Sequence, residues 1–197
     1  MSNPSLRTLL GRPGMLSAPG ARDAVGAQPV GQAGYEAVYT NGAATSLAYG
    51  YPDVGLLDLG EMAANAGRMA RPITVPLIAD TGYGSELNVV RTVREHEVRG
   101  VAAIHIEDQV APKRRGHLHG NEVVGRGEFV SKIRAALEAR GSREFLVIAG
   151  TDARAAPGRD GAVHVTEAAC RLTRAGLSGE PHARAVADGL SKPEGLA

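Results

Sequence analysis

Acidic residues follow several short apolar runs in this sequence. Asp80, Glu107 and Asp152 each lie at or just beyond the end of such a run. If the runs are parallel strands, their carboxyl ends meet at one edge of a sheet, and these carboxylates converge there. Converging carboxylates repel one another unless a cation neutralises them. Oxygen ligands with few histidines and no cysteine favour Mg²⁺ or Mn²⁺ over zinc, so the pattern predicts a magnesium or manganese site.

Each of these features also has a simpler structural explanation. Asp53, in a Tyr-Pro-Asp turn, and Asp108 could cap helices or pair with an arginine, as acids in loops commonly do. The segment 81–84, with two glycines, could cradle an anion with its backbone N–H groups or could be only a tight turn. The residues alone leave both explanations open.

A basic loop, residues 113–120, follows the acidic residues around Glu107. It holds three cationic side chains and two histidines, with Gly116 and Gly120 among them. Such a loop could close as a flap over an anionic substrate, or it could be a solvated surface loop.

Five apolar runs rich in small or β-branched residues are predicted to be strands. Their nearly continuous apolarity is typical of strands buried on both faces of a parallel sheet. The runs are Met15–Ala18, Ala37–Thr40, Val75–Ala79, Val101–Ile106 and Phe145–Ala149.

Three helices are predicted between these runs. Asp58–Arg71 opens with a capping-box pair of acids, Ser85–Arg99 opens with a serine cap and is followed by a glycine, and Glu128–Arg140 has apolar residues at helical spacing. His96 lies among charged residues of the second helix and is predicted to face solvent. Between the first two strands, Pro29 and the glycines on either side predict a kinked or shortened helix.

The alternation of strands and helices predicts an α/β fold with a parallel sheet. Five βα units suit an open doubly wound sheet, and they equally suit an incomplete (β/α)8 TIM-barrel, which typically needs about 250 residues. The length of 197 residues favours the open sheet, whereas the motifs favour the barrel. Residues 1–155 are predicted to form the partial barrel domain. Residues 156–197 are predicted to be an atypical tail with one possible helix, because they contain no Ile, Phe, Tyr or Met.

Composition narrows the class of protein. The 22 basic and 21 acidic residues leave a net charge of +1, which does not indicate nucleic-acid binding. One cysteine excludes an internal disulfide and a cysteine-based zinc site. No apolar run approaches the roughly 20 residues of a membrane span, and residues 1–14 lack the apolar core of a signal peptide. A cytoplasmic protein without a membrane partner is expected.

Several motifs in order resemble the phosphoenolpyruvate mutase/isocitrate lyase superfamily, in particular its methylisocitrate lyase-like and carboxyphosphonoenolpyruvate mutase-like branch. The resemblance runs from about Arg7 to about Ala155. The motifs that carry it are Ala18-Pro19-Gly20, Tyr51-Pro52-Asp53, Ala79-Asp80-Thr81-Gly82-Tyr83-Gly84, His105-Ile106-Glu107-Asp108-Gln109, Gly116-His117-Leu118 and Thr151-Asp152-Ala153.

The resemblance implies a TIM barrel with Mg²⁺ or Mn²⁺ at its carboxyl-terminal rim and a small α-keto or enol carboxylate as substrate. Family members cleave C–C bonds or rearrange P–C bonds next to an enolate, whose charge the metal stabilises as a Lewis acid. By motif position the metal-site acids are Asp53, Asp80 and Glu107. The implied substrate-binding residues are Tyr39, Asn41, Gly42, Ala43, Gly82, Gly116 and Gly150, and the implied catalytic positions are Lys113, Arg115 and His117.

Three departures from the family pattern stand out. Arg115 occupies the place of the lyases' gating-loop cysteine, Gly150 occupies the place of a carboxylate-binding arginine, and the motif ending the third strand lacks two residues, one of them an acid before Asp80. The leading hypothesis is a magnesium-dependent lyase or mutase. The alternatives are a catalytically impaired or truncated copy that keeps at most ligand or metal binding, and an open-sheet binding module. Unpaired strand edges also predict a possible homo-oligomer.

Overall fold

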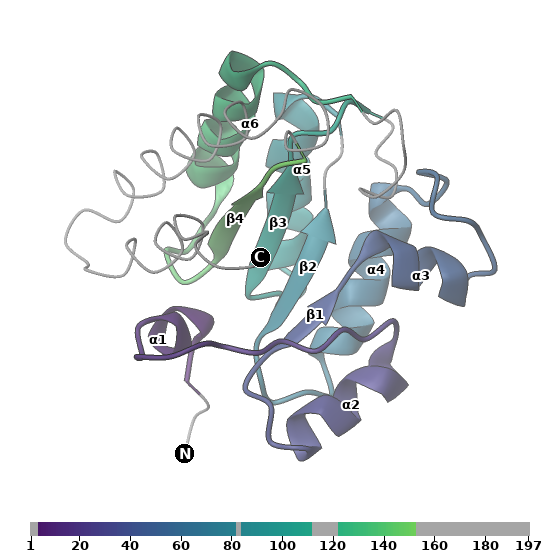
Figure 1. Cartoon of the computed structure of the whole chain (residues 1–197), viewed down its shortest axis with the longest axis vertical. Coiled ribbons are helices and arrows are strands. Elements are labelled where there is room, and N and C mark those ends of the chain that lie inside the picture. The colour runs from purple at the N-terminus through teal and green to yellow at the C-terminus, as the bar shows by residue number, and fades with distance from the viewer. Residues whose placement is uncertain (1–3, 82–83, 112–121, 153–197) are drawn as a thin grey trace, which may run out of the picture.

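The fold is a parallel sheet covered by helices, seen in a computed structural model that describes residues 4–81, 84–111 and 122–152 (Figure 1). The described strands form one sheet in the order β1-β2-β3-β4, and each neighbouring pair is parallel. Helices connect the strands in sequence, which is the βα repeat that the sequence predicts. The strands are β1 (Val38–Thr40), β2 (Leu77–Thr81), β3 (Ala103–Glu107) and β4 (Leu146–Gly150).

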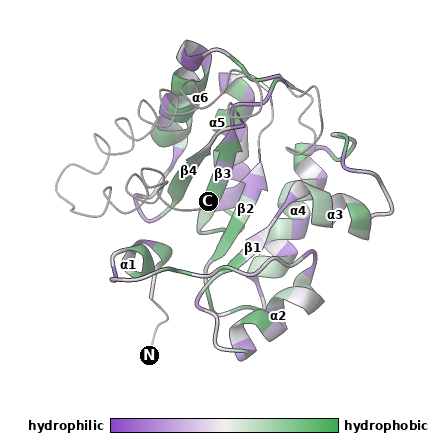
Figure 2. Ribbon diagram, in the orientation of Figure 1, coloured by the Kyte–Doolittle hydropathy of each residue, from purple (hydrophilic) through white to green (hydrophobic). Residues whose placement is uncertain are grey.

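Two apolar clusters pack against the two faces of this sheet. The larger cluster joins alternate strand residues such as Leu77, Ala79 and Ile104 to the helices α4 (Leu59–Ala70), α5 (Glu86–Glu97) and α6 (Arg126–Ala139). Figure 1 shows these three helices together on one side of the sheet. The strands are mostly hydrophobic, with hydrophilic residues near the tip of β2 (Figure 2).

The smaller cluster lies on the opposite face of the sheet. It consists of Ile78, Ala103 and Leu6, and Leu6 belongs to the short helix α1 (Leu6–Leu10) near the amino-terminal ends of the strands. Successive strand residues alternate between faces, so Asp80, His105 and Glu107 share the face of this cluster but lie nearer the carboxyl ends. This face is therefore apolar at one end and polar at the other.

The first predicted strand, Met15–Ala18, is wrong. Met15 is 90% exposed, and this run takes part in no strand of the sheet. Only a single parallel bridge follows it, at Gly20 with Tyr39, where the Ala21 N–H donates to the Tyr39 carbonyl at 2.8 Å. Pro19 accepts from the Tyr39 N–H at 3.0 Å but has no N–H of its own, so a regular ladder cannot continue through it.

The three long helices form as predicted, with small shifts of their ends. In α4 the Asp58 carboxylate accepts from the Glu61 N–H at 2.8 Å and the Glu61 carboxylate accepts from the Asp58 N–H at 2.9 Å, which completes the capping box. After α5, Gly100 adopts a positive φ of 80°, the conformation that favours glycine beyond a helix end. The helix α6 begins at Arg126, two residues before the predicted start.

Two shorter helices flank β1. The nine-residue helix α2 (Ala24–Gln32) contains Pro29, in agreement with the predicted short helix, and Asp23 caps it by accepting from the Gly26 N–H at 2.7 Å. The helix α3 (Gly42–Ala48) follows β1 directly, and Asn41 caps it by accepting from the Ala44 N–H at 2.7 Å. None of the helices in the described part of the chain has the length and apolarity that crossing a bilayer needs.

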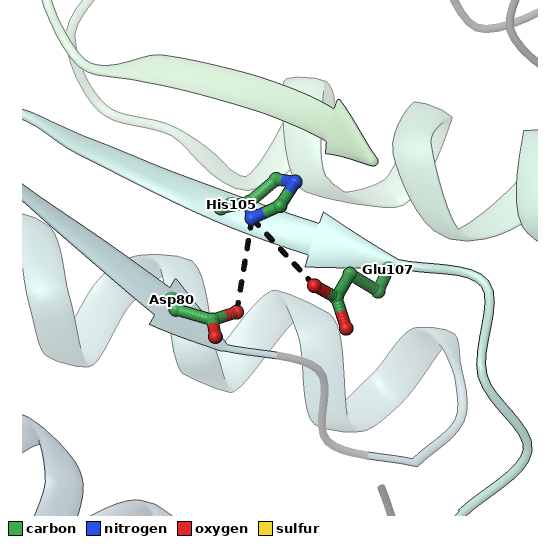
Figure 3. Close-up of side chains that lie close together, drawn as sticks. All are labelled: Asp80, His105 and Glu107. Atoms are coloured by element: carbon green, nitrogen blue, oxygen red, sulfur yellow. Dashed lines mark ion pairs between the residues drawn. The ribbon is translucent and has the colours of Figure 1, made fainter. Parts of the chain in front are cut away.

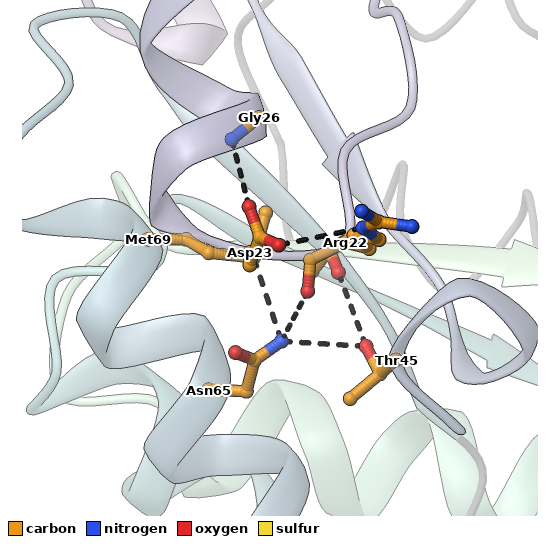
Figure 4. Close-up of polar contacts among 7 residues, drawn as sticks. Arg22, Asp23, Gly26, Thr45, Asn65 and Met69 are labelled. Carbon is orange, nitrogen blue, oxygen red and sulfur yellow. Dashed lines mark hydrogen bonds and ion pairs between the residues drawn. The ribbon is translucent and has the colours of Figure 1, made fainter. Parts of the chain in front are cut away.

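Asn65 of α4 links the beginnings of α2 and α3. Its side chain is buried, and its amide nitrogen donates to the Arg22 carbonyl at 2.8 Å and lies 3.4 Å from the Thr45 hydroxyl oxygen (Figure 4). This part-buried hydrogen bond ties the chain entering α2 to α4.

Replacing Asn65 with leucine is expected to lower the free energy of unfolding by about 1 kcal/mol, because the hydrogen bond to the Arg22 carbonyl is lost. Urea denaturation measures this change. Arg91→Ala, at an exposed position of α5, is the control, with an expected change within about 0.5 kcal/mol. Equal effects of the two substitutions would contradict the assigned role of Asn65.

The predicted exposure of His96 is wrong. The side chain is 1% exposed, and its Nδ1 lies 2.9 Å from the Thr92 carbonyl oxygen. Charged neighbours in the sequence suggested a solvent-facing position, but α5 packs against both α4 and α6, which leaves it a narrow exposed face. Burial is the main cause that lowers the pKa of His96, and the nearby Arg99 lowers it further.

Stability is expected to fall as the pH drops below about 6.5, the ordinary pKa of histidine. In that range the unfolded chain takes up a proton at His96 that the folded chain, with its lowered pKa, does not bind. One titrating group can change the free energy of unfolding by at most about 1.4 kcal/mol per pH unit. Urea denaturation between pH 5 and 8 on His96→Leu should show a smaller slope than the parent chain. An unchanged slope would rule out His96 as the source.

Candidate active site

Two carboxylates and an imidazole meet at the carboxyl ends of β2 and β3. Asp80 pairs with His105 across the two strands, and Glu107 lies two residues beyond His105 on the same face. The Nδ1 atom of His105 is 3.8 Å from an Asp80 carboxylate oxygen and 3.9 Å from a Glu107 carboxylate oxygen (Figure 3). Their ligand atoms all lie within 4.8 Å of one another.

This group of three fits a divalent cation. All three side chains are partly buried, between 12% and 21% exposed, so their charges lie in a less polar medium than bulk water. Two carboxylates supply the hard oxygen ligands that Mg²⁺ and Mn²⁺ prefer, and the imidazole adds a nitrogen, a ligand more typical of other transition metals. The two carboxylates of the donor set therefore match the metal expected from the sequence.

Tyr39 of β1 joins this group from the neighbouring strand. Its hydroxyl oxygen lies 3.1 Å from Nδ1 of His105. Burial, followed by the negative charges of Asp80 and Glu107, raises the pKa of Tyr39 above its ordinary value. The phenol therefore stays protonated at neutral pH, and its hydroxyl keeps a proton that it can donate at the site.

A second set of hydrogen bonds fixes the ends of β3 and β4. Asp108 is fully buried and accepts from the Thr151 hydroxyl at 2.5 Å and from the Asp152 N–H at 2.9 Å. Gln109 donates to the carboxylates of Asp152, at 2.5 Å, and of Glu107, at 3.3 Å. Asp108 therefore holds the ends of β3 and β4 together. The sequence suggested instead that it caps a helix or pairs with an arginine.

Asp53 lies beside the start of α3. Its carboxylate oxygen is 3.5 Å from the point where a Cβ on Gly42 would lie. Among the described residues, the group of potential metal ligands contains Asp80 and Glu107 together with His105, but not Asp53. The structure thus brings two of the three predicted metal-site acids together.

The remaining predicted site residues fall into two sets. Tyr39 lies at the site, Asn41, Gly42 and Ala43 form the start of α3, and Gly150 ends β4 next to His105. The others lie outside the described residues, namely Gly82, Lys113, Arg115, Gly116 and His117.

Sequence reasoning placed His105 at a strand end but gave it no role in metal binding. The signal was present in the spacing, because residues two apart on a strand share a face and His105 is two residues before Glu107.

Comparison with known proteins decides the family. The family model described as phosphoenolpyruvate phosphomutase matches residues 6–179. The chain belongs to the phosphoenolpyruvate mutase/isocitrate lyase superfamily. The α/β fold expected from the resemblance is therefore confirmed, and its solved relatives are TIM-barrel proteins.

The relatives are enzymes of this superfamily. The chain is 47% identical over 161 residues to 2,3-dimethylmalate lyase of Eubacterium barkeri, a match that covers 80% of this chain and 56% of the relative. A structure of oxaloacetate acetylhydrolase in complex with the inhibitor 3,3-difluorooxalacetate is similar with a TM-score of 0.82, at 32% identity, covering 96% of this chain and 68% of the other.

A third similar structure was solved with a metal ion. It is phosphonopyruvate hydrolase in complex with oxalate and Mg²⁺, with a TM-score of 0.73 at 32% identity, covering 85% of this chain and 58% of the other. The chain spans about half the length of the curated relatives it matches, for example 56% of the dimethylmalate lyase.

Asp108→Ala is expected to lower the free energy of unfolding by about 2–3 kcal/mol, because two donors at the end of β4 lose a buried charged acceptor. Thermal and urea denaturation measure this loss. Glu122→Ala, at an exposed acid outside this network, is the control and should leave stability nearly unchanged. A loss no larger than that of Glu122→Ala would show that the network does not hold the two strands.

Proposed function

We propose that this chain carries the site of a Mg²⁺- or Mn²⁺-dependent lyase or mutase that acts on a small α-keto or enol carboxylate through an enolate-like intermediate. The observation that supports this is the group of Asp80, His105 and Glu107 beside Tyr39, at the carboxyl ends of the strands of a fold from this superfamily. The reaction is either C–C cleavage or rearrangement of a P–C bond.

In this proposal Asp80, Glu107 and His105 hold the cation. When bound, the cation supplies Lewis acidity that stabilises negative charge on the enolate oxygen. The protonated Tyr39 hydroxyl lies 3.1 Å from Nδ1 of His105, and with that nitrogen bound to the cation its proton would be available to an oxygen of the substrate. Asp53, beside the start of α3, would contribute to metal binding directly or through a water molecule.

The substrate would lie above these residues at the edge of the sheet. We propose Asn41, Gly42 and Ala43 on the α3 side, and Gly82, Gly116 and Gly150 on the loops and β4, as the residues that line its carboxylate. Lys113, Arg115 and His117 would belong to the loop that closes over it and would carry the catalytic positions. The relatives suggest 2,3-dimethylmalate, oxaloacetate and phosphonopyruvate as the first compounds to test.

We further propose a cytoplasmic location and no nucleic-acid partner, and the balanced charge supports the second of these. We also propose self-association, because β4 is an outer strand of the described sheet and strand edges favour pairing.

The test is calorimetric titration with oxalate, a mimic of a small enolate, in the presence and absence of Mg²⁺ or Mn²⁺. We expect oxalate to bind only with the metal present. Glu107→Gln should weaken this binding by at least about tenfold, because a charged ligand is lost. Glu122→Gln, at an exposed position outside the site, is the matched control and should bind oxalate like the parent chain.

Absence of oxalate binding by the folded chain at millimolar metal would overturn the proposal. Metal-dependent oxalate binding without turnover of any of the three compounds would instead support the alternative, a chain that keeps ligand binding but has lost catalysis.

A further inference from the structure

Gln109, two residues beyond the end of β3, bridges two carboxylates. Its side-chain amide nitrogen donates to the Asp152 carboxylate at 2.5 Å and to the Glu107 carboxylate at 3.3 Å. An amide nitrogen carries two hydrogens, so one side chain can serve both acceptors. Gln109 is 6% exposed, which leaves little room for water to replace either hydrogen bond. The amide therefore joins an acid of the candidate metal site to the chain that follows β4.

The two oxygens of the Glu107 carboxylate have different neighbours. Oε2 accepts the hydrogen bond from Gln109, whereas Oε1 lies 3.9 Å from Nδ1 of His105, on the side of the metal-ligand group (Figure 3). The last side-chain torsion of a glutamate has broad preferences, so the carboxylate turns easily unless something holds it. A hydrogen bond to Oε2 restricts this rotation and keeps Oε1 directed towards His105.

Backbone hydrogen bonds hold the amide of Gln109 in place at both of its ends. The carbonyl of the preceding residue accepts from the Val124 N–H at 2.7 Å, and the N–H of the following residue donates to the Glu122 carbonyl at 2.9 Å. On the other side of the bridge, the Asp152 N–H donates to the buried Asp108 carboxylate at 2.9 Å. Gln109 thus reaches Glu107 from a fixed backbone and is anchored to a fixed acceptor.

We propose that Gln109 is a positioning residue of this site, which orients the Glu107 carboxylate for the cation. A neutral amide does this without bringing a positive charge next to the metal, as a lysine or arginine would. The bridge from Gln109 to Glu107 rests on geometry, whereas its use in metal binding rests on the proposed function. Loss of the amide is expected to free the carboxylate and weaken metal binding.

The test compares Gln109→Met with Gln32→Met by two measurements. Methionine is as long as glutamine but has no hydrogen to donate, and Gln32 is a matched control because it is exposed at the end of α2. Carboxyl ¹³C spectra of glutamate-labelled protein, with the Glu107 signal assigned by its loss in Glu107→Gln, report the carboxylate without metal. Titration with Mn²⁺, followed by electron paramagnetic resonance, reports metal affinity.

Gln109→Met should shift the Glu107 signal and weaken Mn²⁺ binding by about tenfold or more, a size typical of lost support for a ligand. Gln32→Met should change neither measurement. In the Glu107→Gln background no carboxylate remains to be oriented, so Gln109→Met should change Mn²⁺ affinity by no more than about twofold. An unmoved Glu107 signal in Gln109→Met, or an undiminished effect in the Glu107→Gln background, would overturn the proposal.

Two further outcomes are informative. If Gln109→Met does not fold, Gln109→Asn keeps a polar amide that is too short to bridge both carboxylates, and it should show the same signal shift and loss of Mn²⁺ affinity. Failure of both variants to fold would overturn the proposal, because Gln109 would then serve the fold and not the site. If the parent chain binds no Mn²⁺, the proposed function fails, but the carboxyl spectra still decide whether Gln109 orients Glu107.

Discussion

The parallel alignment of the strands is the constraint on which the site depends. Because β2 and β3 run in the same direction with Asp80 opposite His105, and because residues two apart share a face, three polar side chains reach one place from two strands. An antiparallel partner would place the end of one strand beside the start of the next. The chemistry of the site is thus a direct consequence of the βα repeat, in which every connection returns the chain to the same end of the sheet.

The sheet face that carries the site is divided along the strands. Towards the amino-terminal ends, Ile78 and Ala103 pack with Leu6 of α1, and this apolar contact closes the face. Towards the carboxyl ends, the polar group is only partly buried, so its carboxylates keep some contact with water. Full burial of both charges would be costly without a cation, whereas partial burial lets the site exist before a ligand arrives.

Much of the fold could be predicted from the sequence, because its signals are local. The capping box at Asp58 and Glu61 and the glycine after α5 depend on residues a few positions apart, and both helix ends form where expected. The first strand could not be predicted correctly, since an apolar run looks the same whether or not a partner strand accepts it. His96 was misjudged for a similar reason, because its burial comes from α4 and α6, which are distant in sequence.

In the candidate site, too, the contacts between residues distant in sequence could not be predicted. The sequence indicated the acids Asp80 and Glu107, which the structure brings together, but the link between His105 and Gly150 needed coordinates. A glycine adds nothing to the charge pattern of a sequence. That the His105 ring lies where a Cβ on Gly150 would be is visible only in the structure. The ring belongs to the strand that carries the metal-site acid, while the glycine belongs to the next strand, whose end Asp108 contacts through Thr151 and Asp152. Asp108 therefore fixes the end of β4 beside the strand that carries His105 and Glu107, and this attachment between two strands is invisible in the sequence of either one.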